Sequence, residues 1–344
     1  MAGRSVEVGR SGPILKGMPR SSDADGPRRP PEPRTPAGDL RRVGVEIEFA
    51  GLDVPDAARL VGDLFGGDIE DAGANRRRVT GTGWGDFTVE LDAQILQDGP
   101  DGKDAVAKPD GAALEALGKT VAGIVPVEIV APPIPWPELG RLADLTDGLR
   151  AAGGRGTADN PLYGFGLHLN PEVAHEDADY ILAMLRAYMV LSEGLREEIG
   201  VDPTRRLLPY IEDFPDVYVA QVLDPDYRPG QAALIADYIA ANPTRNRALD
   251  MLPLFRHLDE EAVTSRLDDA SLVKARPTFH YRLPDCDLSD PDWSPVTEWN
   301  RWVEVEELAA DGGRLAAIAA EHRARLARPA PTRWLEKVRS WVGQ

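Results

Sequence analysis

Short segments in which apolar and polar residues alternate recur along this chain, and they constrain its fold more than any other feature. In the clearest segment, apolar residues occupy every second position of residues 41–49: Val43, Val45, Ile47 and Phe49. Side chains two positions apart point to the same face of a β-strand. These apolar residues would therefore face a core, while Glu46 and Glu48 would project together from the other face. The pattern predicts a strand that is buried on one side only.

The remaining segments indicate the order of the predicted elements. Strand patterns occupy five further stretches: 76–82, 86–93, 126–130, 164–170 and 278–283. Helical periodicity occupies 55–65, 112–122, 135–151 and 177–199, and two or three helices are expected from residue 295 onwards. Neighbouring strands with one-sided alternation favour an antiparallel or mixed sheet, so the predicted fold class is α+β.

Charge and composition exclude several classes of protein. The net charge is −18, yet residues 1–42 carry +4, so the rest of the chain carries −22. A body this acidic disfavours nucleic acid as a partner, and no apolar stretch is long enough to predict a membrane span. The single cysteine, Cys286, cannot form an internal disulfide, which favours a reducing, cytoplasmic setting.

Polar side chains gather on the predicted strands at spacings that point them the same way. Five strands contribute them: Glu46 and Glu48, Glu90 and Asp92, Glu128, His168 and Asn170, and His280 and Arg282. A single pair of this kind is typical of a solvated sheet face. Carboxylates from three strands would repel one another if they met without cations. Because Mg²⁺ prefers carboxylate oxygens, water and phosphates, the combination predicts a divalent-metal site.

Four of these segments resemble successive motifs of one enzyme family. They are Gly44-Val45-Glu46-Ile47-Glu48-Phe49, Glu128-Ile129-Val130-Ala131-Pro132-Pro133, Gly166-Leu167-His168-Leu169-Asn170 and Phe279-His280-Tyr281-Arg282. Their order is similar to that of the amidoligase family, which belongs with glutamine synthetase and glutamate–cysteine ligase among the carboxylate–amine ligases. The resemblance runs from about Arg41 to about Val305.

The resemblance implies a curved, mostly antiparallel sheet with helices on its convex side and ATP with two or three Mg²⁺ ions on its concave face. By analogy, Glu46 and His168 would hold one metal, and Glu48, Glu90 and Glu128 another. Arg282 would stabilise the transferred phosphoryl group, which makes Arg282 and Glu128 the catalytic candidates. The implied chemistry activates a carboxylate as an acyl phosphate and then joins it to an amine. The substrates would be small molecules or peptides, with their identity open.

One position departs from the family pattern. The last motif usually reads Glu-x-Arg, whereas this chain has His280 before Arg282. An imidazole is a neutral, softer ligand than a carboxylate, and it suits Mn²⁺ or Zn²⁺ better than Mg²⁺. Two rival functions therefore stay open. One is a non-catalytic descendant that binds a metal or a partner, and the other is a phosphotransferase on the same sheet.

Two weaker candidates and three segments complete the predictions. Trp84, in the Gly-rich turn at 81–85, could stack on a base, and Arg247 could meet a phosphate or carboxylate; a packed turn aromatic and a salt-bridged loop arginine are the competing interpretations. Residues 1–40 are predicted to be a disordered tail because prolines crowd it and apolar periodicity is missing. The catalytic domain would then span 41–310, and 311–344 would be a helical extension packed on it. No sequence feature indicates the oligomeric state.

Overall fold

The computed structural model describes residues 26–92, 125–159, 164–201, 211–267 and 270–328. Within these ranges, nine strands form one sheet in the order β2-β3-β4-β5-β1-β7-β9-β8, with β6 paired to one end of β1. The pairings between these strands are all antiparallel. The strands are β1 (Arg42–Phe49), β2 (Asp68–Gly73), β3 (Arg76–Thr82), β4 (Gly85–Leu91), β5 (Val127–Val130), β6 (Ile134–Pro135), β7 (Leu167–Pro171), β8 (Leu249–Asp250) and β9 (His280–Tyr281).

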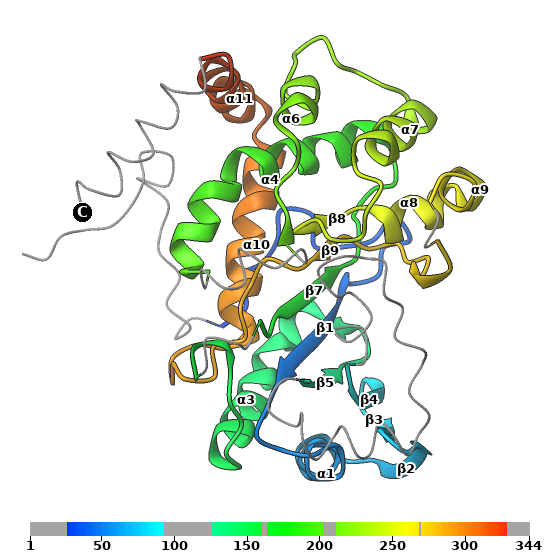
Figure 1. Cartoon of the computed structure of the whole chain (residues 1–344), viewed down its shortest axis with the longest axis vertical. Helices are drawn as coiled ribbons and strands as arrows, with labels where there is room; N and C mark the ends of the chain where they lie inside the picture. Colours follow the sequence, from blue (N-terminus) through cyan, green and yellow to red (C-terminus); the bar gives the residue numbers. More distant parts are fainter. Residues whose placement is uncertain (1–25, 93–124, 160–163, 202–210, 268–269, 329–344) are drawn as a thin grey trace, which may run out of the picture.

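The helices follow the strands in a mixed order, and together the elements confirm an α+β fold with a mostly antiparallel open sheet (Figure 1). The α-helices are α1 (Val54–Phe65), α3 (Leu142–Ala151), α4 (Ala178–Ile199), α6 (Asp216–Val222), α7 (Gln231–Ala241), α8 (Leu252–Leu258), α9 (Glu260–Thr264), α10 (Pro295–Ala310) and α11 (Gly312–Leu326). Short 3₁₀ helices lie at Trp136–Arg141, Thr157–Asp159 and Ala270–Leu272. No helix in these ranges is long and apolar enough to cross a membrane.

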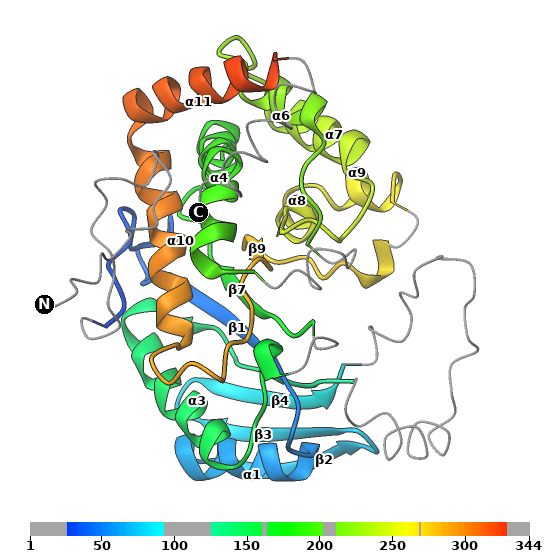
Figure 2. The same cartoon turned by 60° about the vertical axis from the view of Figure 1, so that its left-hand side comes forward.

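The alternation of β1 divides the sheet into an apolar and a polar face, as the sequence predicts. The apolar side chains of residues 43–49 are at most 1 % exposed. Helix α1 packs against β3, and its Ala57, Ala58 and Val61 are buried in the same core as Val79 of that strand. On β9, the Tyr281 ring lies 5.3 Å from that of Trp302 in α10. Figure 2 shows α3 and α10 along one side of the sheet. The polar face of the sheet lines a pocket.

Several element boundaries differ from those expected. Strand β2 has no apolar alternation and all six of its residues are exposed, so its pairing with β3 has no counterpart in the hydrophobic pattern. The helix expected at 135–151 begins as a 3₁₀ helix before α3. The last strand shrinks to two residues. The helix predicted at 112–122 lies outside the described residues.

The predicted boundary of the N-terminal tail is wrong for residues 26–40. The Arg28 guanidinium donates to Glu307 of α10 at 2.7 and 2.8 Å, and the Trp299 indole donates to the Arg28 carbonyl at 2.9 Å. Next along the chain, buried Arg41 forms two 2.8 Å hydrogen bonds with buried Glu306. This segment is therefore held by ion pairs to a helix far away in sequence, a form of stabilisation that leaves no apolar periodicity.

Helix α11 begins the predicted C-terminal extension. Its Arg325 pairs with Glu193 of α4 at 2.6 Å, and Arg323 pairs with Asp224 at 2.6 Å. Its apolar contribution is small, since Leu315 and Ala319 are the residues of α11 that are buried. Residues 329–344 lie outside the described part of the chain.

Candidate functional site

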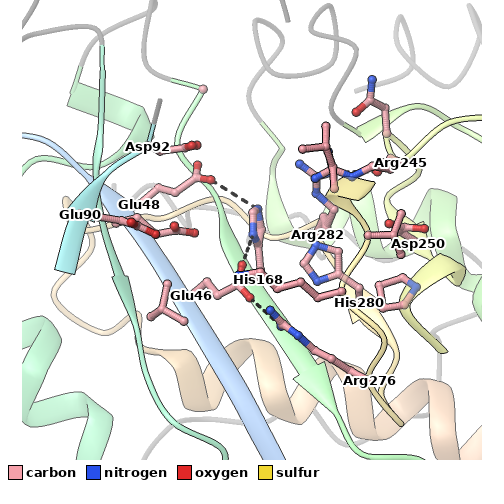
Figure 3. Close-up of a pocket in the computed structure, with 18 residues that line it drawn as sticks. Glu46, Glu48, Glu90, Asp92, His168, Arg245, Asp250, Arg276, His280 and Arg282 are labelled. Carbon is pink, nitrogen blue, oxygen red and sulfur yellow. Dashed lines mark hydrogen bonds and ion pairs between the residues drawn. The ribbon is translucent and has the colours of Figure 1, made fainter. Parts of the chain in front are cut away.

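The polar face of the sheet forms the floor of a pocket (Figure 3). The floor is acidic and comes from β1, β4, β5 and the residue after β4: Glu46, Glu48, Glu90, Asp92 and Glu128. The opposite side is basic and carries Arg245, from the loop before β8, with Arg276 and Arg282, from the segment around β9. Lys274 also lines the pocket. His168 and His280 line the pocket as well. The pocket thus sets a cluster of negative charge against a cluster of positive charge.

Strand register brings three carboxylates into one row across the floor. Glu48 of β1 lies directly opposite Glu128 of β5, and Glu128 lies directly opposite Glu90 of β4. Directly opposed side chains have their Cβ atoms roughly 5 Å apart, and like charges in such pairs destabilise a sheet. The next pair along β1 sets Glu46 opposite His168 of β7. The antiparallel register therefore assembles side chains that are far apart in the sequence.

The first candidate metal position is formed by Glu48, Glu128 and His168. Each offers a ligand atom, and the three atoms lie within 4.8 Å of one another. Glu48 is oriented by the backbone N–H of Gly166, which donates to Oε2 at 2.7 Å. Its other oxygen lies 3.6 Å from His168 Nε2. The Gly166 amide thus fixes Oε2 of Glu48, which leaves Oε1 on the side of His168.

The second candidate position is formed by Glu46, His168 and His280, whose ligand atoms also lie within 4.8 Å of one another. Asn170 joins two of these residues. Its Nδ2 donates to Glu46 Oε1 at 3.0 Å, so its Oδ1 is the atom that meets His280 Nδ1 at 2.7 Å. An amide oxygen only accepts. His280 Nδ1 therefore carries the proton, and Nε2 keeps the lone pair that a metal would need.

The two positions share His168, and a neutral imidazole has one lone pair. His168 Nδ1 lies 3.2 Å from Glu46 Oε2, and a carboxylate at that distance accepts the Nδ1 proton. This tautomer directs the lone pair of Nε2 to the side of Glu48 and Glu128. His168 would then serve the first position, while Glu46 and His280 would serve the second.

The pKa shifts of the site residues reflect their burial and the repulsion between neighbouring carboxylates. Burial, together with the charges of Glu46, Glu48, Asp92 and Glu90, raises the pKa of Glu128 well above its ordinary value. Burial also raises the pKa of Glu46, but its hydrogen bond with His168 and the nearby His280 and Arg276 outweigh this and lower it. Burial lowers the pKa of His280, so its imidazole is neutral. The floor therefore favours either a proton or a cation near Glu128, which fits a divalent metal.

Glu90 and Asp92 line the pocket but belong to neither group of three ligands. Glu90 accepts a 2.5 Å hydrogen bond from Arg76 Nε, which partly neutralises the edge of the acidic row. Arg282 lies across the pocket from these carboxylates, and its Nη1 donates to the carbonyl of Arg245 at 2.7 Å (Figure 3). Asp250, whose pKa is raised to about 7 by burial, lies beside it on the basic side.

Two residues predicted to contact a nucleotide lie elsewhere. Arg247 is 8 % exposed, and its guanidinium donates to Asn242 Oδ1 at 2.9 Å and to Glu212 Oε2 at 3.1 Å. Trp84 packs against Phe65, and its indole donates to Glu138 at 2.6 Å. Neither lines the pocket, so the structure supports the competing interpretations: a packed turn aromatic for Trp84 and a salt-bridged arginine for Arg247.

The alternating patterns in the sequence do not predict most of the cationic residues that line the pocket. Arg245 stands two positions before Arg247 and lines the pocket in its place. Lys274 and Arg276 lie between the 3₁₀ helix at Ala270–Leu272 and β9, in a region without regular periodicity. The available signal is positive charge, because these residues are cations in loops of a strongly acidic chain. Loop charge alone does not tell which side chains turn inward.

Comparison with known protein families identifies the family of this chain. The profile of a family described as "Putative amidoligase enzyme" matches residues 39–304, which include all the strands and both candidate metal positions. The chain therefore belongs to the amidoligase family, as its motifs predict, and the family indicates a ligase. A search of curated proteins found no match, and a search of solved structures found none either.

Proposed function

We propose that this protein is an ATP- and divalent-metal-dependent ligase that joins a carboxylate to an amine. The carrying observation is that two groups of metal-ligand atoms, sharing His168, lie in one pocket whose other side is basic. Phosphoryl transfer requires charge neutralisation and in-line positioning more than it requires a protein nucleophile. An acidic floor that binds cations, facing arginines that bind phosphate oxygens, meets both requirements.

The residues of the floor divide the proposed work. Glu48, Glu128 and His168 would hold one ion, and Glu46 with His280 would hold the other. When bound, such ions would neutralise phosphate oxygens and hold the triphosphate in place. Because His280 supplies an imidazole where oxygen ligands are usual for magnesium, Mn²⁺ suits the second position at least as well as Mg²⁺.

Arg282 is placed to act on the phosphoryl group during transfer. Its guanidinium lies on the basic side and is held by the Arg245 carbonyl, so it is oriented before a ligand arrives. A substrate carboxylate would attack the γ-phosphorus of ATP, forming an acyl phosphate and releasing ADP. An amine would then attack the acyl carbon, lose a proton and release phosphate. Pre-oriented donors of this kind contribute several kcal/mol to charge stabilisation, typically about 3.

The first test is Mg·ATP and Mn·ATP binding by calorimetry, with the wild type beside Glu48→Gln. We expect metal-dependent binding that weakens at least about tenfold in the mutant, because an amide replaces a ligand carboxylate. Glu70→Gln is the matched control, since Glu70 is an exposed glutamate on β2 of the same sheet. No binding with either metal would contradict the proposal and favour a non-catalytic descendant.

The second test separates a ligase from a phosphotransferase. ADP release would be measured with panels of amino acids, dicarboxylates and amines, singly and in pairs. A ligase requires an acid and an amine together for sustained turnover and yields inorganic phosphate with an amide. Transfer of phosphate to a nitrogen group without an acid would show the rival activity instead.

A further inference from the structure

Arg276 joins the basic side of the pocket to its acidic floor. Its Nη1 donates to Glu46 Oε1 at 3.3 Å, and Figure 3 shows the guanidinium reaching toward that carboxylate. The backbone is held in place by a hydrogen bond from Arg276 N to the Pro253 carbonyl at 3.0 Å. The side chain itself is 36 % exposed. The backbone of Arg276 is thus fixed, while its side chain is exposed enough for the guanidinium to change position.

Glu46 is also a member of the second candidate metal position. The guanidinium and a metal ion at that position would use the same carboxylate. The Arg276 guanidinium is partly exposed, so solvent screens its pairing with Glu46, while a divalent ion carries twice the charge in a smaller radius. The ion would therefore displace the guanidinium at small cost.

A displaced guanidinium would remain inside the pocket's basic side. Arg245 and Lys274 line the same pocket, and Lys274 is exposed. Guanidinium groups bind phosphate and carboxylate oxygens with paired hydrogen bonds. Three cations in a pocket that would also hold metal ions would supply positive charge for an oxyanion.

We propose that Arg276 exchanges partners: it neutralises Glu46 until a divalent cation binds there, and it then binds an oxyanion of the ligand together with Arg245 and Lys274. This makes Arg276 a positioning residue that couples cation binding to anion binding. The nature of the anion, a nucleotide polyphosphate or a substrate carboxylate, rests on the proposed function. The exchange itself does not, because it concerns Glu46, a metal ion and an arginine.

Cation affinity without any nucleotide is the first measurement. In Mn²⁺ titrations, Arg276→Gln should bind the ion about two- to fivefold tighter than the wild type, because a competitor for Glu46 is lost. Lys274→Gln is the matched control. It removes the same charge from the same pocket without a contact to Glu46. Equal tightening in both variants, or none in Arg276→Gln, would overturn the exchange.

Chemical modification of arginine is the second measurement and follows Arg276 directly in the wild-type protein. Phenylglyoxal labelling, located by mass spectrometry, should become faster at Arg276 when Mn²⁺ is added. Arg59, exposed on α1, serves as the internal reference and should not change. Labelling of Arg276 that is indifferent to Mn²⁺ would overturn the proposal.

The anion is identified by adding tripolyphosphate or glutarate to the Mn²⁺-loaded protein. Slower labelling of Arg276 with tripolyphosphate supports a nucleotide polyphosphate as its partner, and slower labelling with glutarate supports a substrate carboxylate. Protection by neither would overturn the anion half of the exchange. If cation-dependent exposure and protection are found but ATP is never turned over, the proposed function fails and the exchange stands.

Discussion

Among single residues, Asn170 is the one whose hydrogen bonds connect two candidate metal ligands, Glu46 and His280. One amide group donates to Glu46 and accepts from His280. It thereby sets the tautomer of an imidazole that would bind metal through Nε2. Partners of this kind commonly change metal affinity by about 10–100-fold when they are removed. The strand pattern indicates Asn170 only as a polar neighbour of His168, whereas its position links two of the candidate ligands.

His280 should decide which metal the second position prefers. Replacing it by glutamate exchanges a neutral imidazole for a carboxylate, so the ratio of Mn²⁺ to Mg²⁺ affinity should fall by about tenfold. Competition titrations of the two ions on the wild type and His280→Glu measure this ratio. His175→Glu, at an exposed histidine, is the control. An unchanged ratio in His280→Glu would show that His280 is not a ligand.

Among the elements, the central strands of the sheet pair although like charges lie opposite one another on their polar face. Three neighbouring strands set Glu48, Glu128 and Glu90 in one row, although like charges in opposed positions weaken strand pairing. The apolar face of the same strands stabilises them by burying Val45, Ile47 and Val89 completely or nearly so. Burial on one face thus offsets repulsion on the other, and a bound cation would relieve that repulsion.

Replacing Glu128 by glutamine should therefore stabilise the protein while weakening its site. The folded state holds the Glu128 proton more tightly than the unfolded chain, because its pKa is raised above the ordinary 4.5. The wild type consequently loses stability as the pH rises above about 4.5 toward the folded pKa. The gain from Glu128→Gln should be near zero at pH 4.5 and about 1 kcal/mol at pH 8, the scale of a cross-strand pair.

Urea denaturation at the two pH values measures this gain in the free energy of unfolding, with chelator present. Glu261→Gln, at an exposed residue of α9, is the control. Added Mn²⁺ should raise the melting temperature of the wild type and have a smaller effect on Glu128→Gln. A Glu128→Gln protein that is less stable than the wild type at pH 8 would contradict the prediction.

Across the whole molecule, segments far apart in the chain complete both the fold and the pocket. Residues 26–40 bind to α10 through Arg28. The basic side of the pocket comes from residues 245–282, whereas the acidic floor comes from residues 46–128. The family match, over 39–304, begins near the end of the N-terminal segment and ends within α10.

A truncation that starts at Leu40 should consequently be less stable than one that starts at Gly26. It removes Arg28, which leaves the Trp299 indole and the Asn300 amide of α10 without their partners. We expect a loss of about 1–3 kcal/mol in the free energy of unfolding. Denaturation of the two truncated proteins under one condition measures it. Equal stabilities would restore the prediction that residues 1–40 are a disordered tail.

The buried and polar faces of the strands follow from the sequence alone, because a period of two is a local property of the backbone. The alternation is therefore enough to place Glu46, Glu48, Glu128, His168 and His280 each on the polar face of its own strand. Strand register is different, since it depends on pairing between distant segments of the folded chain. Register opposes Glu48 to Glu128, and the folded sheet places Asn170 between Glu46 and His280.

The basic side of the pocket likewise follows from the folded chain and not from local sequence. Arg245 and Arg247 stand two positions apart in one loop, but a loop has no fixed period from which side-chain direction follows. Arg247 turns inward to Glu212 and Asn242, and Arg245 lines the pocket. Arg276 meets Glu46 across 230 positions of the chain. Such contacts depend on where the folded loops lie, and local sequence does not encode that.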